Sequence, residues 1–317
     1  MKNENSPAQT IPYERFSDFI KDGADRYAIL TEYIEKLKLN SAVIPVEQNR
    51  HIFIFPPDQK PLRASGVFPF RGQSPYLLCA HYDRVEGSPG ANDNSAAVFH
   101  LLNAAENLIA RRAKNWLIVF TDKEEIKAGE TLEDQGSFSL AKKIKSWGLE
   151  KARIYNFDCC GAGEVFIIST ITDRILKDSG RPNIEKIRRD VKHLRDHALA
   201  TADSLRFDKV LLAPTPFSDD VGFLRAGLAS QTITILPAQE AEKYEALLRR
   251  QPDFADLIIS GRIKMPEEKR NLPETWKNIN NAGDTPSRLT PQHFSRIVGF
   301  MAELCVLKQK MLTNADQ

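Results

Sequence analysis

Short apolar runs alternate with amphipathic segments along most of this 317-residue chain, and that order limits the possible folds more than any other feature. The run YLLCA is followed by the amphipathic segment SAAVFHLLNAAENLIARR, and NWLIVF is followed by SFSLAKKIKSWG. Further apolar runs are ARIYNF, EVFIIS and SQTITILP, and the closing segment is again helical in pattern. Strands that alternate with helices form a mostly parallel sheet with helices on both faces. The sequence therefore predicts an α/β fold around a mixed, mostly parallel central sheet.

A single domain is expected over residues 1–317, because no internal repeat and no low-complexity linker interrupts the chain. Residues 1–10 are polar and are expected to be disordered. The stretch YERFSDFIKDGADRYAILTEYIEKLKL is helical in pattern, and SAVIPV and HIFIFP predict two strands after it. Residues 239–275 are a polar, helix-rich excursion that is expected to form a lid or a rim.

Composition argues against nucleic acid and membranes as partners. Basic and acidic residues number 44 and 42, so the net charge is only +2. Such a balance argues against a basic surface that would bind nucleic acid. No apolar run approaches the roughly 20 residues of a membrane-spanning helix. The polar start MKNENSPAQT is unlike a signal peptide, and the four cysteines then indicate reduced thiols in a cytoplasmic protein. A secreted chain whose signal has been removed is the alternative, and the oligomeric state stays open.

A histidine and several carboxylates follow three of the predicted strands. His81 follows YLLCA, Glu124 and Glu125 follow NWLIVF, and Asp158 follows ARIYNF. Asp93 lies at the start of a predicted helix, where the positive end of the helix dipole stabilises a carboxylate. Ligands of an open α/β sheet bind beyond the carboxyl ends of its strands, so these five side chains are expected to converge. Imidazole with carboxylates suits zinc, with manganese or cobalt as alternatives.

Each of these residues has a simpler interpretation when it is taken alone. A single histidine after a strand is more often structural than metal-binding. Asp93 is placed to cap the helix that begins near Ser95, and Asp158 is placed to cap a loop. Glu124 and Glu125 are typical of a solvated charge pair. These interpretations weaken together, because all five residues fall at the same edge of the predicted sheet.

Six ordered motifs, AHYDRV, GANDN, FTDKEE, NFDCCG, SDDVGF and DTPSRLT, resemble the co-catalytic zinc aminopeptidases of the MH clan, family twenty-eight. That family also includes the glutaminyl cyclases, and the resemblance runs from about Ala28 to about Val306. It implies a zinc-exopeptidase-like fold and a hydrolase that removes an N-terminal residue from a peptide or aminoacyl substrate by a metal-activated water. One alternative is a catalytically silent relative that binds a peptide in the same cleft. A cyclase-like acyltransferase ranks third.

The resemblance also implies a role for each residue of the metal site. His81, Asp93 and Asp158 match the ligands of a first metal, and Asp93 matches the aspartate that bridges to a second. Glu125 matches a ligand of that second metal. Relatives hold the peptide bond after the bridging aspartate in the cis form, so a cis bond is expected between Asp93 and Asn94.

Four further positions match residues around the metals. Asp83 matches the carboxylate that orients the ligating histidine, and Glu124 matches the general base that takes a proton from the attacking water. Asp219 lies in a segment that resembles the family's Ser-Asp-His motif near the substrate, and here Asp220 replaces the histidine. Both aspartates are therefore expected in the vicinity of the substrate.

The chain departs from the family pattern at two places. The segment IKAGETLEDQ makes the link between Glu125 and Gly136 longer than in relatives. Asn280 stands four residues before the pair Asp284-Thr285, where the family has its last zinc-binding histidine. A second site with Asn280 as ligand would contain oxygen donors alone, which suit harder ions than zinc. One tight zinc site is therefore expected, with a second site that is weak, empty or filled by manganese or another hard ion.

Other candidate ligands are given no metal role. His293 lies beyond the Asp-Thr pair, on the closing helix. His193 and His197 are four residues apart on a charged helix, and the pattern favours a solvated face. Cys159 and Cys160 follow Asp158, where two small residues that pack at a strand end are the simpler interpretation.

Overall fold

The computed structural model describes residues 11–59, 68–127, 129–177, 183–259 and 271–307. The segment expected to be disordered, residues 1–10, lies outside these ranges, and so do residues 260–270 of the expected lid or rim. The prediction of a single domain over the whole chain stays a prediction.

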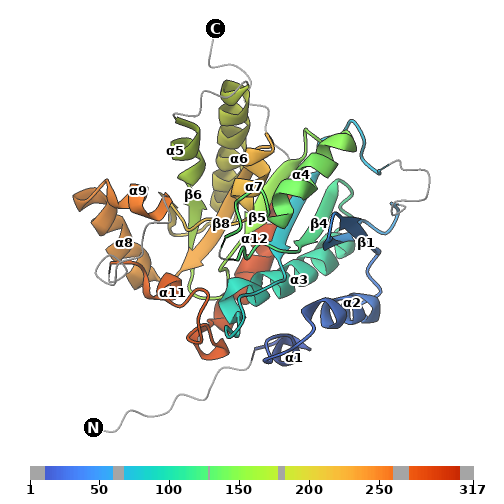
Figure 1. Ribbon diagram of the computed structural model, residues 1–317, viewed down its shortest axis with the longest axis horizontal. Helices are drawn as coiled ribbons and strands as arrows, with labels where there is room; N and C mark the ends of the chain where they lie inside the picture. Colours follow the sequence, from blue (N-terminus) through green and yellow to red (C-terminus); the bar gives the residue numbers. More distant parts are fainter. Residues whose placement is uncertain (1–10, 60–67, 128, 178–182, 260–270, 308–317) are drawn as a thin grey trace.

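Eight strands form one mixed sheet in the order β1-β2-β4-β3-β5-β8-β6-β7, which confirms the predicted α/β fold (Figure 1). The central strands β4, β3, β5 and β8 run parallel to one another. An antiparallel hairpin of β1 and β2 extends one edge, and β6 joins β8 in antiparallel pairing. The strands are β1 (Ser41–Val46), β2 (Asn49–Ile54), β3 (Tyr76–His81), β4 (Trp116–Thr121), β5 (Arg153–Phe157), β6 (Val165–Ser169), β7 (Val210–Ala213) and β8 (Ser230–Leu236).

Helices cover both faces of the sheet, as the alternating pattern predicted. The long helices are α2 (Arg26–Lys36), α3 (Ala97–Ala110), α4 (Gly136–Ser146), α6 (Ile184–Ser204), α8 (Ala238–Arg250) and α12 (Phe294–Val306). The short ones are α1 (Phe16–Phe19), α5 (Ile171–Lys177), α7 (Asp219–Arg225), α9 (Phe254–Ile259) and α11 (Glu274–Lys277), with single turns η1 (Ala91–Ala96), η2 (Pro286–Arg288) and η3 (Pro291–His293). The first helical stretch of the sequence is thus split into α1 and α2.

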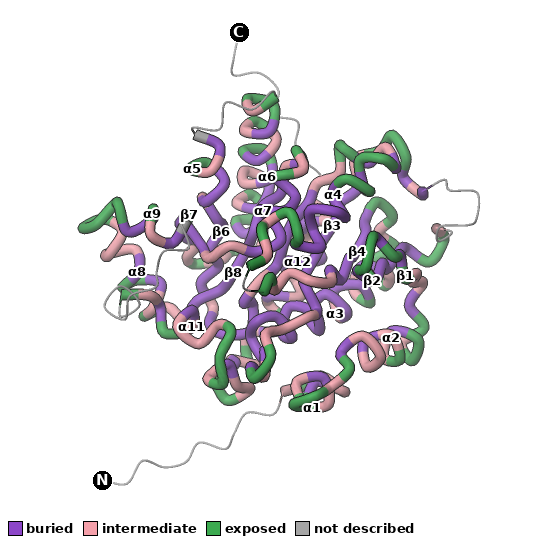
Figure 2. The backbone as a smooth tube through the Cα atoms, in the orientation of Figure 1, coloured by how far each residue is buried: buried purple, intermediate pink, exposed green. Residues whose placement is uncertain are grey.

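Strand β3 shows why the sheet needs helices on both sides. All six of its residues are buried, and Figure 2 shows the central strands as the most buried part of the fold. Leu78 and Ala80 belong to a core shared with α3 and α12, whereas Leu77 and Cys79 belong to a second core shared with α4. Successive side chains of a strand point to opposite faces, so β3 fills both cores and presents only its end to a ligand.

The excursion after β8 packs at the far edge of the sheet. Helices α8 and α9 share a third core with β6, β7 and β8. The ring of Tyr244 on α8 meets that of Trp276 on α11 edge-on, with centroids 5.0 Å apart. The role of this region as a lid or rim stays a prediction. Within the described ranges, no helix combines the length and apolar character needed to cross a membrane.

One buried arginine ties the N-terminal helix to the loops that follow β3. The guanidinium of Arg26, only 5% exposed, donates to the carbonyls of Phe19, Tyr82, Asp83, Pro89 and Gly90 and to the hydroxyl of Ser95. These loops lead from His81 to Asp93. Arg26 therefore holds the backbone directly after His81 and the turn that precedes Asp93.

The histidine pair on α6 corrects one sequence interpretation. His193 is exposed, as expected, but His197 is buried and its Nε2 bonds the carbonyl of Leu304 at 2.9 Å. The ring of His197 also stacks on Tyr76, with centroids 5.4 Å apart. The solvated-face interpretation was wrong for His197 because α6 packs this turn against α12 and the sheet.

His100 on α3 should make the stability of the fold dependent on pH. Its Nδ1 accepts from the hydroxyl of Tyr13 at 2.6 Å, and its Nε2 donates to the carbonyl of Cys160 at 3.1 Å. Burial lowers the pKa of His100 from 6.5 to about 3. As the pH falls below the unfolded value of about 6.5, the unfolded chain takes up a proton that the folded chain excludes.

The contribution of His100 is therefore complete above pH ~6.5 and is lost progressively between pH ~6.5 and ~3. Between pH ~7.5 and ~5.5 the loss should be about 1.4 kcal/mol in the free energy of unfolding. Urea denaturation of His100→Gln should show a pH dependence smaller by about that amount, whereas the exposed control His193→Gln should follow the wild type. An identical pH dependence in His100→Gln and wild type would contradict this assignment.

Candidate metal centre

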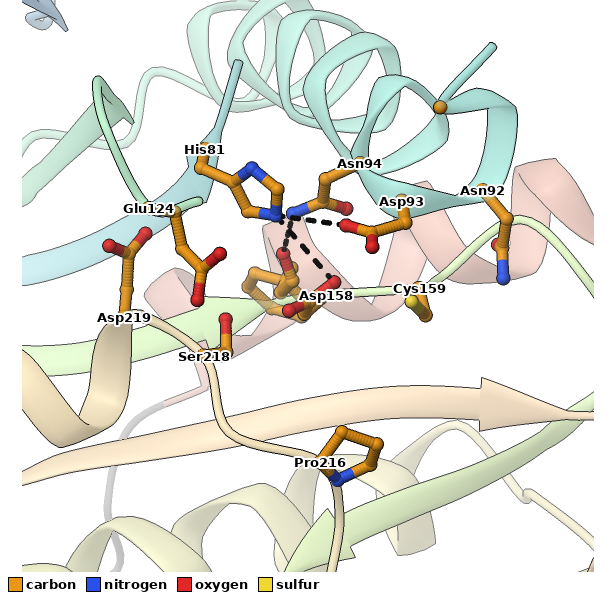
Figure 3. Close-up of polar contacts among 12 residues, drawn as sticks. His81, Asn92, Asp93, Asn94, Glu124, Asp158, Cys159, Pro216, Ser218 and Asp219 are labelled. Carbon is orange, nitrogen blue, oxygen red and sulfur yellow. Dashed lines mark hydrogen bonds and ion pairs between the residues drawn. The ribbon is translucent and has the colours of Figure 1, made fainter. Parts of the chain in front are cut away.

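The carboxyl ends of three adjacent strands, β4, β3 and β5, bring the predicted site residues together (Figure 3). His81 is the last residue of β3, and Asp158 directly follows β5. Glu124 and Glu125 lie in the loop after β4. The Nε2 atom of His81 lies 3.1 Å from Oδ1 of Asp93 and 3.9 Å from Oδ1 of Asp158. The convergence expected from the strand ends is therefore present in the fold.

Two groups of three side chains have the spacing of metal ligands. One group is His81, Asp93 and Glu125, and the other is Asp93, Asp158 and Cys159. Within each group the ligand atoms all lie within 4.8 Å of one another. Asp93 belongs to both groups, and its role as a ligand that bridges two ions stays a prediction.

Asp93 is held in position by hydrogen bonds to its backbone, and it does not cap a helix. The carboxylate of Asp284 accepts the N–H of Asn92 at 2.8 Å and the N–H of Asp93 at 2.9 Å. The Asp93–Asn94 peptide bond is cis, which confirms that prediction. Helix α3 begins at Ala97 with Ala96 as its cap, so Asp93 does not have the simpler role of capping it.

Asp83 connects the histidine to the two glutamates. Its Oδ1 lies 3.5 Å from Nδ1 of His81 and accepts the N–H of Glu124 at 3.1 Å, while its Oδ2 accepts the N–H of Glu125 at 3.0 Å. Burial raises the pKa of Asp83, but the electrostatic interaction with His81 and the bonds from the two N–H groups outweigh burial and lower it overall. Asp83 thus stays charged and fixes both the imidazole and the glutamate loop.

The long loop after Glu125 returns to the site and supplies a residue that the sequence did not reveal. Gln135 donates from Nε2 to Oε1 of Glu124 at 2.9 Å and to the backbone oxygen of Glu124 at 3.2 Å. The N–H of Gly136 closes the loop on the carbonyl of Lys123 at 2.8 Å. A Cβ at Gly136 would lie 1.8 Å from the carbonyl oxygen of Asp122, so only glycine permits this closure.

The site carries an excess of negative charge. Burial raises the pKa of Glu124 well above its ordinary value, and the charges of Glu125 and Asp219 raise it further. Burial, followed by the charge of Asp93, raises the pKa of Glu125 to about 9. Burial likewise raises the pKa of Asp219 to about 6 and that of Asp220 to about 7. Buried carboxylates that repel one another in this way favour a bound cation.

The residues present fit a metal ion. Both ring nitrogens of His81, Oε1 of Glu125 and Oδ1 of Asp158 are buried without a hydrogen-bond partner among the described residues. Buried polar atoms left unpaired in this way are unfavourable unless a ligand satisfies them. A donor set of imidazole, carboxylates and a nearby thiol is suited to zinc.

Asn280 lies where the sequence placed it, beside Glu125. Its Nδ2 donates to Oε2 of Glu125 at 3.0 Å, so its amide nitrogen rather than its oxygen faces that carboxylate. The neighbouring Asn278 and Asn281 bond to backbone atoms of their own segment. Of these three asparagines, Asn280 is the one that contacts Glu125, and it does so through its amide nitrogen. Its correspondence to the last ligand of the family stays a prediction.

A small pocket of about 40 Å³ adjoins the carboxylates. Besides the site residues, its walls come from Thr215, Pro216 and Phe217 before α7, from Thr232 and Thr234 on β8, and from Trp276 and Ile279. Asp219 and Asp220 are fully buried and do not line it. Asp219 lies beside Glu124 in Figure 3 and accepts a hydrogen bond from Thr121, so a role of either aspartate near the substrate stays a prediction.

Comparison with known proteins adds a family and a fold. The model of peptidase family M28 matches residues 63–298, while no curated protein sequence matches the chain. A glutaminyl cyclase from Bacteroides thetaiotaomicron bound to N-acetylhistamine is similar in structure, with a TM-score of 0.58, 15% identity, and coverage of 93% of this chain and 94% of that one. The LapA aminopeptidase of Legionella pneumophila has a TM-score of 0.57 and 12% identity, over 92% and 67% of the two chains.

A zinc aminopeptidase from Bacillus subtilis is also similar, with a TM-score of 0.47 and 17% identity over 81% of this chain. Only 49% of that aminopeptidase is covered, so the chain spans about half its length. At these identities the structural likeness shows the fold alone, and the family match is the finding that bears on chemistry.

Proposed function

The chain belongs to peptidase family M28, and from this premise we propose that it is a metal-dependent hydrolase that removes N-terminal residues from peptides. One observation carries the proposal. Glu124, whose carboxylate is held by Gln135, lines the same pocket as the candidate ligands Asp93, Glu125 and Asp158. A carboxylate that belongs to neither ligand group and faces the pocket is placed to act as a base.

His81, Asp93, Glu125 and Asp158 would hold zinc at this site. Bound zinc would supply Lewis acidity, which lowers the pKa of water and polarises a carbonyl. Asp83 keeps the imidazole of His81 in its orientation, and Asp284 keeps the backbone of Asp93 in place.

Glu124 would take the proton of the attacking water and deliver it to the leaving amine. Burial raises the pKa of this carboxyl group, so that it holds a transferred proton more strongly than an exposed glutamate would. Gln135 holds Oε1 in place while the other carboxylate oxygen is available for the transfer. The small pocket would receive the N-terminal side chain of the peptide.

Two other functions each have a supporting observation. The amide nitrogen of Asn280 donates to Glu125 where relatives place a ligand, which favours a catalytically silent relative that binds a peptide in the same pocket. The correspondence in length with the glutaminyl cyclases favours a cyclase-like acyltransferase, which would act on N-terminal glutamine. The products distinguish the three functions. The hydrolase would release a free N-terminal residue, the silent relative would give no product, and the cyclase-like enzyme would release ammonia and leave a cyclised N-terminus.

The test combines metal analysis with product analysis. His81→Ala should lower the zinc content of protein purified under limiting zinc, because it removes the imidazole from a ligand group. The exposed control His193→Ala should bind as much zinc as the wild type. Zinc-loaded wild type should release free amino acids from aminoacyl amides and short peptides. Unchanged zinc content in His81→Ala, or no released residue from loaded wild type, would overturn the proposal.

A further inference from the structure

We propose that Cys159 is a metal ligand, which completes a three-residue set with Asp93 and Asp158. Its sulfur and one carboxylate oxygen from each aspartate all lie within 4.8 Å of one another. Figure 3 shows the thiol of Cys159 beside the carboxylates of Asp93 and Asp158. The inference rests on the proposed function in one respect, because that function requires a metal at this site.

The other buried cysteines have a different environment. Cys160 belongs to the core shared with α3 and α12, and its sulfur contacts the carbonyl of Ile233 at 3.4 Å. Cys79 belongs to the core shared with α4, and its sulfur contacts the carbonyl of Tyr155 at 3.5 Å. Cys159 is buried too, but none of the hydrophobic clusters found in the described residues includes it. The packing role expected from the sequence therefore accounts for Cys160 and leaves Cys159 unexplained.

His81 independently indicates that an ion belongs next to this thiol. The imidazole is fully buried, and neither of its nitrogens has a hydrogen-bond partner among the described residues. Its Nε2 is directed at Oδ1 of Asp93 and lies 3.9 Å from Oδ1 of Asp158. Both aspartates belong to the set that contains Cys159. Cations in the two adjoining sets would satisfy the unpaired Nε2 of His81 and the unpaired Oδ1 of Asp158.

Neither ligand set requires an imidazole at position 280. The two ligand sets share Asp93, and neither of them contains Asn280. His81 with Asp93 and Glu125 forms one set, and Cys159 with Asp93 and Asp158 forms the other. Each set has three protein donors and leaves a position open, as catalytic zinc sites do.

The sulfur also changes the ion that the second set would take. Oxygen donors alone favour magnesium, manganese or calcium, whereas a thiolate is a soft donor that favours zinc. The set that contains Cys159 is a mixed oxygen and sulfur site, unlike the all-oxygen site of Asp93, Glu125 and Asn280 expected from the sequence. The structure thus assigns zinc, rather than a harder ion, to both sets.

X-ray absorption on the full chain loaded with excess zinc, after unbound metal is removed, tests this assignment. Wild type should show a zinc–sulfur shell at about 2.3 Å, distinct from nitrogen and oxygen neighbours at about 2.0–2.2 Å. The shell should persist in the matched control Cys160→Ala and disappear in Cys159→Ala. Zinc titration should show loss of one tight site, with affinity at least ~10-fold weaker, in Cys159→Ala only. Circular dichroism of each variant confirms that it is folded.

The outcomes separate this inference from the proposed function. Zinc bound by wild type without a sulfur neighbour would overturn the role of Cys159 and leave the hydrolase proposal standing. Wild type that binds no zinc would overturn both. A sulfur shell that disappears in Cys160→Ala but remains in Cys159→Ala would transfer the role to the neighbouring cysteine and refute the assignment. The wild-type spectrum alone decides the first two outcomes, even if Cys159→Ala does not fold.

Discussion

Replacement of Glu124 by glutamine should lower kcat/KM on aminoacyl amides by about 10²- to 10⁴-fold, because an amide cannot accept the proton of the attacking water. Glutamine keeps the shape of the side chain and can still bond Gln135. Glu124 belongs to neither ligand group, so the zinc content of the variant should equal that of the wild type.

Glu133→Gln provides the control for this experiment. Glu133 lies in the loop between Glu125 and Gly136, is exposed, and pairs with Arg225 at 3.2 Å on the surface. Its replacement should leave the rate within a small factor of the wild type. Both variants are compared with zinc fully loaded, and a Glu124→Gln enzyme as fast as wild type would exclude a role for Glu124 as base.

Arg26→Met should lower the free energy of unfolding by about 3–5 kcal/mol, because each buried acceptor left without a donor costs about 1–3 kcal/mol. The variant would remove a donor from five carbonyls and from the hydroxyl of Ser95, although the carbonyls of Pro89 and Gly90 keep bonds from Arg84 and Ser95. Urea denaturation monitored by circular dichroism measures this change. An unchanged slope of the free energy of unfolding against urea concentration would show that the denatured state is the same.

The control for Arg26 is Arg111→Met, which removes a single ion pair with Glu303 that is partly exposed. Such pairs contribute about 0–1 kcal/mol, so this variant should remain close to wild type. Arg26→Met should also bind zinc more weakly in its folded fraction, because the bonded carbonyls flank His81 and Asp93. A stability within about 1 kcal/mol of wild type would show that the loops hold their positions without the guanidinium.

The sequence predicted those parts of the fold that depend on local pattern. Apolar runs identified seven of the eight strands, and strand ends placed His81 and Asp158 at one edge of the sheet. The strand β7 was missed, because Val210–Ala213 is only four residues long and follows no clear alternation. The side of the sheet that each helix covers was not predicted either, since periodicity does not determine which core a helical face joins.

The supporting residues could not be predicted because they depend on how loops close. Gln135 is eleven residues from Glu124 and reaches it only because Gly136 lets the loop return. Asp284 reaches Asp93 across 191 residues. Cys160 packs in the core, whereas Cys159 faces the candidate metal site, because the backbone after β5 directs their side chains differently. The residue types alone do not predict that direction. The family resemblance predicted the candidate ligands, whereas the hydrogen bonds that hold these residues follow from the tertiary structure.

Arg26 also determines when the metal site can be assembled during synthesis. The match to the family begins at residue 63, so the arginine lies outside the segment that carries the family's signature. Ser95, the most distant of its acceptors, is 69 residues further along the chain. At about 5–20 residues per second, the guanidinium leaves the ribosome roughly 3–14 seconds before that acceptor does. Until the loops after β3 have been synthesised, the guanidinium has only the carbonyl of Phe19 to bond. A fragment limited to residues 63–298 would contain every candidate ligand and still lack the residue that fixes their loops.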